Sequence, residues 1–348
     1  MNIIVTWMYS SPEGENILHS QIGSATDTQG IQNLYWRCVF LLFESSVRLN
    51  PGARHILFIN KVPPDTIDNI DTRKLIQQYN IELVHFTTIT KSPSDYYGAW
   101  NTQFIILDVL DWLKEHVDDD DNIFILDSDI IFNKPLSPDI VNELRDHKAL
   151  LYSIDYAHNH KINGLTRSEL ASIAKDLYDE FPANDFIYSG GEFVCCLGSE
   201  VVKIAELGRK YYLLCLERHK KMLPKFNEEA HLLSFVYTLL GYKTHTANQF
   251  IKRIWTNRRY FSNIDGKESD LILWHFPAEK NTGFLRVFRS YRFIEGTYQL
   301  TMKNFRQAYG IEETSLAKIS RYGKQYILPQ YQSVRRALSG FYARFRDL

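Results

Sequence analysis

The feature that most constrains this fold is an alternation of apolar runs and helix-patterned segments over the first 135 residues. Short apolar runs typical of buried strands lie at residues 3–5, 55–59, 81–86 and 123–126. Residues 29–49, 72–79 and 100–113 lie between them and carry apolar side chains at helical spacing. Repeated strand–helix–strand order predicts an α/β fold, with a mainly parallel sheet covered by helices on both faces.

The second half of the chain is less regular. Thr166 and Glu169 form a capping box before a helix expected to run to about residue 180. Strands are predicted at 192–197 and 271–274, a long helix at 199–221, and a further helix capped by Asn227 and ending before Gly241. We therefore expect a catalytic domain at 1–283, with a nucleotide-binding half at about 1–135 and an acceptor half at about 136–283. A basic helical appendage would follow at 284–348.

Charge is distributed unevenly along the chain. The whole sequence has a formal net charge of −1, which argues against nucleic acid as a partner. Residues 284–348 contain 12 Lys and Arg against 4 Asp and Glu, so this segment carries +8 and the remainder −9. Such asymmetry predicts that the appendage meets an anionic surface.

The last residues carry an apolar stripe at helical spacing. Residues 331–346 place Val334, Leu338 and Phe341 on one face, flanked by Arg335 and Arg336. A basic amphipathic helix of this kind can lie on an anionic membrane, and packing against the catalytic domain is the equal alternative. No apolar run approaches the roughly 20 residues that span a bilayer, and the four cysteines form no zinc pattern. These features predict a cytoplasmic protein, peripheral on the inner leaflet of the membrane if it works there, with its oligomeric state left open.

Two carboxylates follow the last apolar strand of the first half. Asp127-Ser128-Asp129 comes directly after residues 123–126 and before the apolar run 130–132. Ligands of open α/β sheets bind at the carboxyl ends of strands. Carboxylates together with substrate phosphates are the usual ligands of Mg²⁺, and Mn²⁺ accepts the same oxygens. A bare D-x-D also occurs by chance, but its place after a buried strand predicts a site for a metal and a diphosphate.

A second group of candidate residues lies further along the chain. Tyr188-Ser189-Gly190-Gly191-Glu192 is a small-residue turn entering a strand, and its glycines would let the backbone approach a ligand. Asn227-Glu228-Glu229-Ala230-His231 opens a predicted helix, where the helix dipole would keep carboxylates ionised. Such a carboxylate could act as a nucleophile or stabilise an oxocarbenium-like centre.

These motifs, in this order, resemble the retaining GT-A glycosyltransferases that include the blood-group A and B enzymes and the alpha-galactosyltransferases. The resemblance covers about residues 123–245. It implies a Rossmann-like GT-A fold, metal binding by Asp127 and Asp129 with Ser128 beside the diphosphate, and Glu229 as nucleophile or stabiliser next to Glu228. It also implies that Ser189, Gly190, Gly191, Glu192 and His231 contact the donor sugar or the acceptor.

The segment Trp274-His275-Phe276-Pro277-Ala278-Glu279-Lys280 has a partial likeness to a second family. It resembles the late His-x-x-Gly-x-x-Lys segment of bacterial lipooligosaccharide alpha-galactosyltransferases and glycogenin, although the glycine is absent. The likeness implies that His275 is a third metal ligand and that Lys280 contacts the diphosphate. A buried histidine with satisfied hydrogen bonds is the alternative.

Lesser candidates lie near the ends of other predicted strands. Thr6, Trp7 and Tyr9 end the first strand, where the resemblance implies contacts with the base and ribose, and core packing explains them equally well. Asn101 opens the helix before the D-x-D strand, and Asp155 follows another predicted strand; either could contact the donor.

Together these features predict a metal-dependent, retaining hexosyltransferase. Its expected donor is a UDP-sugar, UDP-galactose or UDP-N-acetylgalactosamine, with Mn²⁺ or Mg²⁺. Its expected acceptor is a glycan or glycolipid of bacterial surface polysaccharide or lipooligosaccharide synthesis. The alternatives are a sugar-1-phosphate nucleotidyltransferase, although residues 10–14 lack the basic loop of that class, and a non-catalytic glycan- or nucleotide-binding module.

Overall fold

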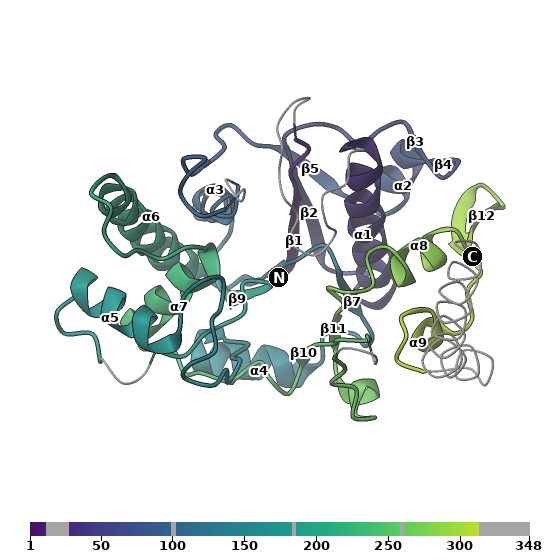
Figure 1. The fold of residues 1–348 in the computed structure, drawn as a ribbon. Helices are drawn as coiled ribbons and strands as arrows, with labels where there is room; N and C mark the ends of the chain where they lie inside the picture. Colours follow the sequence, from purple (N-terminus) through teal and green to yellow (C-terminus); the bar gives the residue numbers. More distant parts are fainter. Residues whose placement is uncertain (12–27, 99–101, 183–185, 258–260, 313–348) are drawn as a thin grey trace, which may run out of the picture.

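A six-stranded sheet with the order β5-β2-β1-β6-β9-β8 forms the centre of the fold (Figure 1). The structure is a computed structural model, and it describes residues 1–11, 28–98, 102–182, 186–257 and 261–312. The strands of the sheet are β1 (Asn2–Met8), β2 (Arg54–Ile59), β5 (Glu82–His85), β6 (Asn122–Leu126), β8 (Ala149–Leu150) and β9 (Phe193–Leu197). The first four run parallel, whereas β9 pairs antiparallel with both β6 and β8. The predicted α/β class with a mainly parallel sheet is therefore confirmed.

The parallel strands are continuous apolar runs because helices cover both faces of the sheet. Side chains alternate along β1: Ile3 and Val5 pack against one set of helices, whereas Ile4 and Met8 face the opposite side. The first set comprises α3 (Ile106–Leu113), α5 (Arg167–Leu177), α6 (Gly198–Lys220) and α7 (Glu229–Leu239). The opposite side is covered by α1 (Thr28–Leu49), α2 (Thr72–Gln78) and α4 (Pro138–His147).

Most helix boundaries agree with the sequence prediction, with two instructive differences. Thr166 and Glu169 form the predicted capping box of α5. The N-cap of α7 is Glu228 rather than Asn227. The Oδ1 of Asn227, the atom that could cap a helix, instead accepts from Lys225 at 3.3 Å. The predicted helix from residue 100 is regular only from Ile106, after a turn at 102–105.

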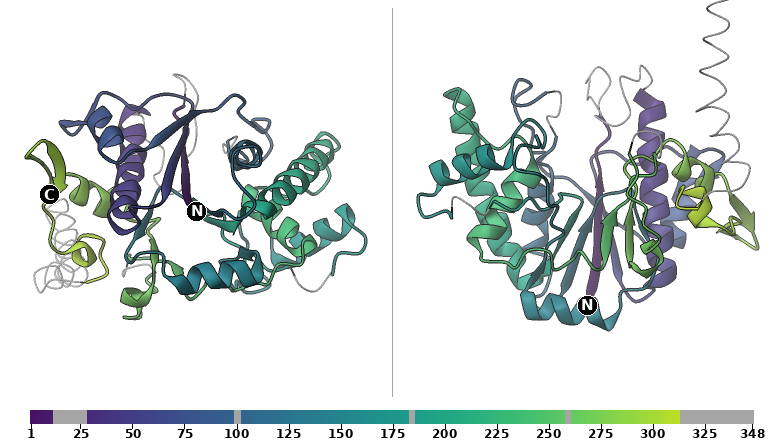
Figure 2. Two further views of the ribbon diagram at one scale, coloured as in Figure 1. Left: turned by 180° about the vertical axis from the view of Figure 1, so that it is seen from behind. Right: turned by 60° about the horizontal axis from the view of Figure 1, so that its bottom comes forward.

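A second, three-stranded sheet lies beside the carboxyl end of β6. It contains β10 (Ile251–Arg253), β11 (Leu273–His275) and β7 (Ile130–Phe132), and β11 pairs antiparallel with β7. The register sets His275 opposite Ile130 and also opposite Arg253. Because β7 begins directly after Asp127-Ser128-Asp129, this small sheet brings residues from three distant segments to the carboxyl edge of the central sheet (Figure 2).

The segment after residue 282 differs from the predicted helical appendage. It contains α8 (Gly283–Phe288), a hairpin of β12 (Tyr291–Ile294) and β13 (Thr297–Leu300), and α9 (Phe305–Ala308). The hairpin turns at Glu295-Gly296, both with positive φ, a two-residue turn that suits antiparallel strands. Phe284, Phe288 and Tyr309 share a buried cluster with Trp36 and Phe40 of α1, so this part packs against the catalytic core.

Three short elements complete the described fold. β3 (Thr66–Ile67) and β4 (Ile70–Asp71) form a small hairpin, and η1 (Glu268–Asp270) is a single 3₁₀ turn. In the described part of the chain, the helices are too short or too polar to cross a bilayer. The predicted amphipathic segment 331–346 lies outside the described residues, and the division into two domains stays a prediction.

Candidate active site

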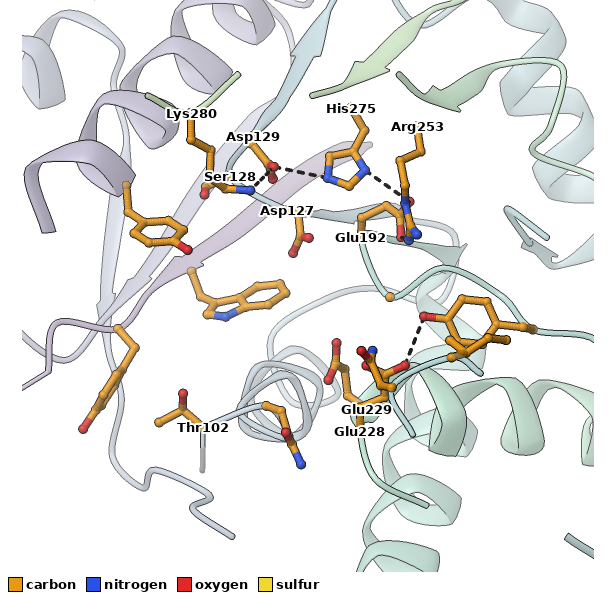
Figure 3. Close-up of a pocket in the computed structure, with 18 of the residues that line it drawn as sticks. Thr102, Asp127, Ser128, Asp129, Glu192, Glu228, Glu229, Arg253, His275 and Lys280 are labelled. Atoms are coloured by element: carbon orange, nitrogen blue, oxygen red, sulfur yellow. Dashed lines mark hydrogen bonds and ion pairs between the residues drawn. The ribbon is translucent and has the colours of Figure 1, made fainter. Parts of the chain in front are cut away.

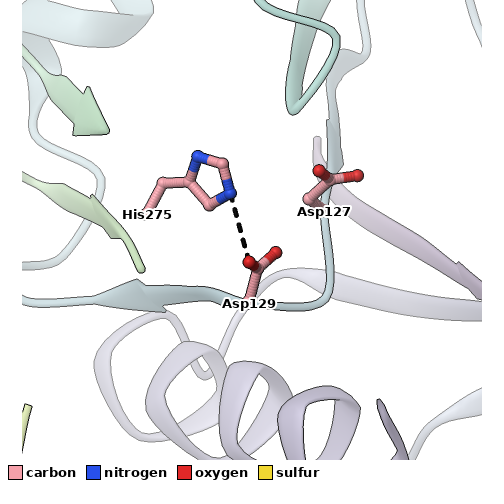
Figure 4. A group of neighbouring side chains, drawn as sticks. All are labelled: Asp127, Asp129 and His275. Carbon is pink, nitrogen blue, oxygen red and sulfur yellow. Dashed lines mark ion pairs between the residues drawn. The ribbon is translucent and has the colours of Figure 1, made fainter. Parts of the chain in front are cut away.

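Two aspartates and a histidine converge where β6 ends and the small sheet begins. Asp127, Asp129 and His275 each offer a ligand atom, and these three atoms lie within 4.8 Å of one another (Figure 4). Nε2 of His275 lies 3.3 Å from Oδ2 of Asp129. Two carboxylates and an imidazole suit Mn²⁺ and are compatible with Mg²⁺. The geometry therefore fits a divalent cation at the predicted D-x-D motif.

A chain of buried charges extends from this group in both directions. Lys280 forms an ion pair with Asp129 on one side. On the other, Nδ1 of His275 lies 3.1 Å from Oε1 of Glu192, and Arg253 binds the same carboxylate with two donors at 2.7 and 2.5 Å (Figure 3). Positive and negative groups thus alternate from Lys280 through Asp129, His275 and Glu192 to Arg253. Buried charges are tolerated when each is paired and hydrogen-bonded in this way.

The alternation of charge controls the ionisation of these groups. Burial alone would raise the pKa of Asp129, but Lys280 and His275 hold that pKa well below its usual range. Burial alone would lower the pKa of His275, but Asp129 and Glu192 raise it to about 9. By contrast, burial and the neighbouring Asp129 raise the pKa of Asp127 to about 6. For Asp127, burial and the charge of Asp129 therefore outweigh the opposite effect of His275 and Lys280.

Two further glutamates face this group across the cavity. Glu228 and Glu229 lie at the start of α7, opposite Asp127 (Figure 3). Tyr188 donates its hydroxyl to Glu228 at 3.1 Å, and the Asn163 amide also donates to Glu228. Burial raises the pKa of Glu228 to about 7, and burial together with Glu228 raises the pKa of Glu229 well above its usual value. Desolvation therefore acts on these pKa values against the expected effect of the helix dipole.

The two glycines of the small-residue turn make room for carboxylates of the protein itself. A Cβ on Gly190 would lie 2.3 Å from a carboxylate oxygen of Glu192, and one on Gly191 would lie 2.9 Å from an oxygen of Glu229. A side chain at either position would therefore crowd these carboxylates. The expected close approach of the backbone to a ligand stays a prediction.

The residues at the end of β6 and on the small sheet form one wall of a cavity, and the start of α7 forms the opposite wall. The cavity has a volume of about 440 Å³. Its volume is within the range of small-molecule sites. Aromatic side chains form much of the remaining lining: Trp7, Tyr9, Tyr35, Tyr156, Tyr188 and Trp255. A cavity with a cation-binding group, a lysine and several aromatic rings can hold an anionic ligand that carries a planar ring.

The structure brings most of the predicted site residues to this cavity. Its lining includes Trp7, Tyr9, Asp127, Ser128, Asp129, Gly191, Glu192, Glu228, Glu229, His275 and Lys280. Among the described residues, Thr6, Asp155, Ser189, Gly190 and His231 do not line it. His231 is fully buried behind Glu228, with Nε2 3.3 Å from Oε1, and Asp155 pairs with His245 at 3.0 Å. Asn101 lies outside the described residues, although the neighbouring Thr102 and Gln103 line the cavity.

Several lining residues had no clear signal in the sequence. Tyr35 belongs to the apolar stripe of α1, and Asn163 and Tyr156 lie in a loop without a recognisable motif. Lys252, Arg253, Arg258 and Arg259 form a basic segment in the sequence, a pattern that favours a solvated loop over a clamp for the diphosphate. Lys252 in fact pairs with Glu268 at 3.0 Å, whereas Arg253 enters the site.

Comparison with known proteins finds similarity at the level of structure. No model of a known protein family matches the chain, and no curated protein matches it either. The chain is similar to the crystal structure of the galactosyltransferase LgtC with donor and acceptor sugar analogs, at 10% identity and a TM-score of 0.45, covering 79% of this chain and 86% of LgtC. It is also similar to the glycosyltransferase GlyE of Streptococcus pneumoniae TIGR4, at 13% identity and a TM-score of 0.42, covering 79% of this chain and about half (55%) of GlyE.

Both neighbours are described as glycosyltransferases. The identities are low and both TM-scores are below 0.5. The function therefore has to be inferred from the residues of the site.

Proposed function

We propose that this protein is a metal-dependent, retaining glycosyltransferase that uses a UDP-hexose, with galactose or N-acetylgalactosamine as the favoured sugar. The observation that carries the proposal is the group Asp127–Asp129–His275 facing Glu228 and Glu229 across one cavity. Asp127, Asp129 and His275 would hold Mn²⁺ or Mg²⁺. The cation would neutralise charge on a departing diphosphate.

The remaining lining suits the other parts of a sugar nucleotide. Lys280 is buried beside Asp129, where its ammonium can contact a phosphate oxygen as well as the carboxylate. Trp7 and Tyr9 lie at the end of β1 and line the same cavity, so either ring can stack on a uracil base. In this arrangement the diphosphate of the donor would lie toward Asp129 and its sugar toward α7.

Glu229 is the proposed partner of the anomeric carbon. In a retaining reaction a carboxylate lies on the face of the sugar opposite the leaving group, where it acts as nucleophile or stabilises positive charge. The raised pKa of Glu229 means that it ionises most readily when positive charge is present in the cavity, since a nearby cation favours the carboxylate form. Glu228, held by Tyr188 and Asn163, positions and electrostatically tunes Glu229.

The acceptor and the cellular role are proposed from the sequence resemblance. A glycan or glycolipid of bacterial surface polysaccharide or lipooligosaccharide synthesis fits a transferase of this kind. The carboxylates at Glu228–Glu229 are compatible with binding sugar hydroxyls as hydrogen-bond donors. The acceptor would approach from the side of the cavity that lies opposite the nucleotide.

Titration calorimetry with UDP, in the presence and absence of Mn²⁺, tests the metal group. The wild-type protein should bind UDP much more tightly with Mn²⁺, and Asp127→Asn should lose this metal dependence, because an amide keeps the shape of the ligand but not its charge. Asp120→Asn, in the exposed acidic turn before β6, is the matched control and should behave as the wild type. Metal-dependent UDP affinity that is unchanged in Asp127→Asn would show that the cation binds elsewhere. A panel of UDP-sugars in a metal-dependent hydrolysis assay would then identify the donor.

A further inference from the structure

The turn after α6 carries the most exposed large apolar side chain among the described residues. Met222 is 94% exposed and the adjacent Leu223 is 46% exposed. Lys220, Lys221 and Pro224 around them are exposed as well. This tip, residues 220–224, is therefore a short protrusion of two apolar side chains beside two lysines.

The backbone of the tip makes the choice of methionine unusual. The Leu223 N–H donates to the carbonyl of Arg218 at 2.9 Å, the closing hydrogen bond of a Schellman motif at the end of α6. Met222 occupies the left-handed position of this motif with φ of 54°, where glycine is the usual residue because it has no Cβ. A side chain that is almost fully exposed gains no packing energy within the chain. Neither the turn nor the core of the protein explains a methionine here.

The tip lies toward the carboxyl edge of the central sheet, the edge at which the cavity is formed. α6 begins beside the start of β6, with the Gly198 N–H donating to the Asp121 carbonyl at 2.8 Å, and its 23 residues run about 34 Å back along the sheet. Just beyond the tip, Lys225 donates to the Tyr96 carbonyl at 2.7 Å. The chain reaches Glu228 of the cavity five residues after Leu223, a span of at most about 18 Å. Figure 2 shows the same arrangement, with α6 rising along the sheet toward its carboxyl edge.

The charge around the tip identifies the kind of surface that it fits. Lys220 pairs with Glu217 at 2.7 Å, whereas Lys221 makes no ion pair with any described residue. Apolar side chains that protrude beside lysines are suited to the headgroup region of an anionic bilayer, where the apolar part is buried and the ammonium meets lipid phosphate. A stable protein interface would need about 800 Å² from each partner, more than two protruding side chains supply.

We propose that residues 220–224 dock on an anionic lipid surface and insert Met222 and Leu223 among the headgroups. This contact is separate from the one predicted for residues 331–346. It places the cavity entrance next to the bilayer, where an acceptor attached to a lipid would be presented. The docking itself does not depend on the proposed reaction.

Site-specific fluorescence tests the contact directly. The four native cysteines are all buried, so a cysteine introduced at position 222 can be labelled selectively with an environment-sensitive dye. In Met222→Cys, vesicles of phosphatidylglycerol and phosphatidylcholine should shift the dye emission to the blue, and vesicles of phosphatidylcholine alone should shift it much less. Leu213→Cys is the matched control, because Leu213 is 54% exposed on the side of the same helix, and its dye should not shift. Sedimentation with vesicles without a shift at position 222 would mean that another segment binds the lipid, and it would overturn the proposal.

A second variant separates docking from folding. Met222→Gly should keep or raise the melting temperature, because glycine suits the left-handed backbone of this turn. Its partition coefficient on the anionic vesicles should fall about fivefold, since part of the inserted apolar surface is lost. The control is Leu213→Ser, because glycine at position 213 would weaken the helix in which Leu213 lies. This variant should leave the partition coefficient unchanged. An unchanged coefficient in Met222→Gly, or an equal loss in Leu213→Ser, would contradict docking through the tip.

Discussion

The two walls of the cavity treat buried charge in opposite ways. On the wall formed by β6 and the small sheet, Asp129 and Glu192 each have cationic partners, and their pKa values lie below the usual range. On the wall formed by α7, Glu228 has hydroxyl and amide partners. Neither Glu228 nor Glu229 forms an ion pair with Lys or Arg in the described chain, and the pKa values of both are raised. On the first wall, the charges of Asp129 and Glu192 are balanced by cationic side chains of the protein itself. On the second wall, a nearby positive charge would favour the carboxylate forms of Glu228 and Glu229, which suits groups that face a developing cation.

The largest expected effect is on the stability of the paired wall. In Arg253→Met the carboxylate of Glu192 would lose two donors while remaining buried, and we expect a loss of about 3–5 kcal/mol in the free energy of unfolding, because an uncompensated buried charge is costly. The double variant Glu192→Gln/Arg253→Met removes both charges and should be less destabilised than the sum of the single variants. Urea unfolding of the wild type, of Arg253→Met, of Glu192→Gln and of the double variant measures this coupling. Additive effects would mean that the pair does not act as a unit.

A large effect on rate is expected from the opposite wall. Glu229→Gln keeps the volume of the side chain but removes its charge, so the rate of transfer should fall about a hundredfold, equivalent to about 3 kcal/mol of transition-state stabilisation. Metal-dependent UDP binding should change little, since the metal group and Lys280 are untouched. Full activity in this variant would move the role to Glu228 or Glu192. The anomeric configuration of the product, read by proton NMR, should be alpha for a galactosyl donor, and a beta product would refute the retaining assignment.

A smaller effect concerns the pH dependence of stability. The pKa of Glu228 is raised from 4.5 to about 7 in the folded protein, so the folded state binds the proton more tightly than the unfolded state. Stability from this group is therefore present below about pH 4.5 and is lost as the pH rises to about 7. Relative to the wild type, Glu228→Gln should become more stable by about 2–3 kcal/mol between pH 4.5 and pH 8. Denaturation curves at several pH values test this, with the exposed Glu115→Gln as a control that should show no such trend.

The smallest expected effect belongs to a carboxylate outside both walls. Asp155 was a candidate for contact with the donor, but its side chain is 71% exposed and pairs with His245. Asp155→Asn should change the free energy of unfolding by less than about 0.5 kcal/mol, because exposed ion pairs contribute little. It should also change the affinity for UDP with Mn²⁺ less than twofold. A tenfold loss of that affinity would show that this loop closes over the donor.

The sequence by itself determined the central architecture and placed Asp127 and Asp129 at the end of a buried strand. The apolar run before Asp127, the helical spacing of α1 and the capping box of α5 are local patterns, and each led to an element that the structure contains. Likewise, the prediction of a metal and diphosphate site at Asp127–Asp129 depended only on the D-x-D motif and the buried strand ahead of it. Local periodicity is sufficient where a segment buries one continuous face, because the spacing of apolar residues then records the geometry of the element.

Only the tertiary structure decided how the charges of the site are paired. Glu192 is 61 residues from Arg253 and 83 from His275, and their contacts depend on the pairing of β10 and β11 beside β7. An ion pair between distant residues leaves no periodic signal, so Arg253 could not be distinguished in sequence from its neighbour Lys252. The same applies to Gly190 and Gly191, since the carboxylates that they accommodate come close only when the strand and α7 are packed together. Long-range packing, rather than local propensity, therefore set the electrostatics on which the proposed reaction depends.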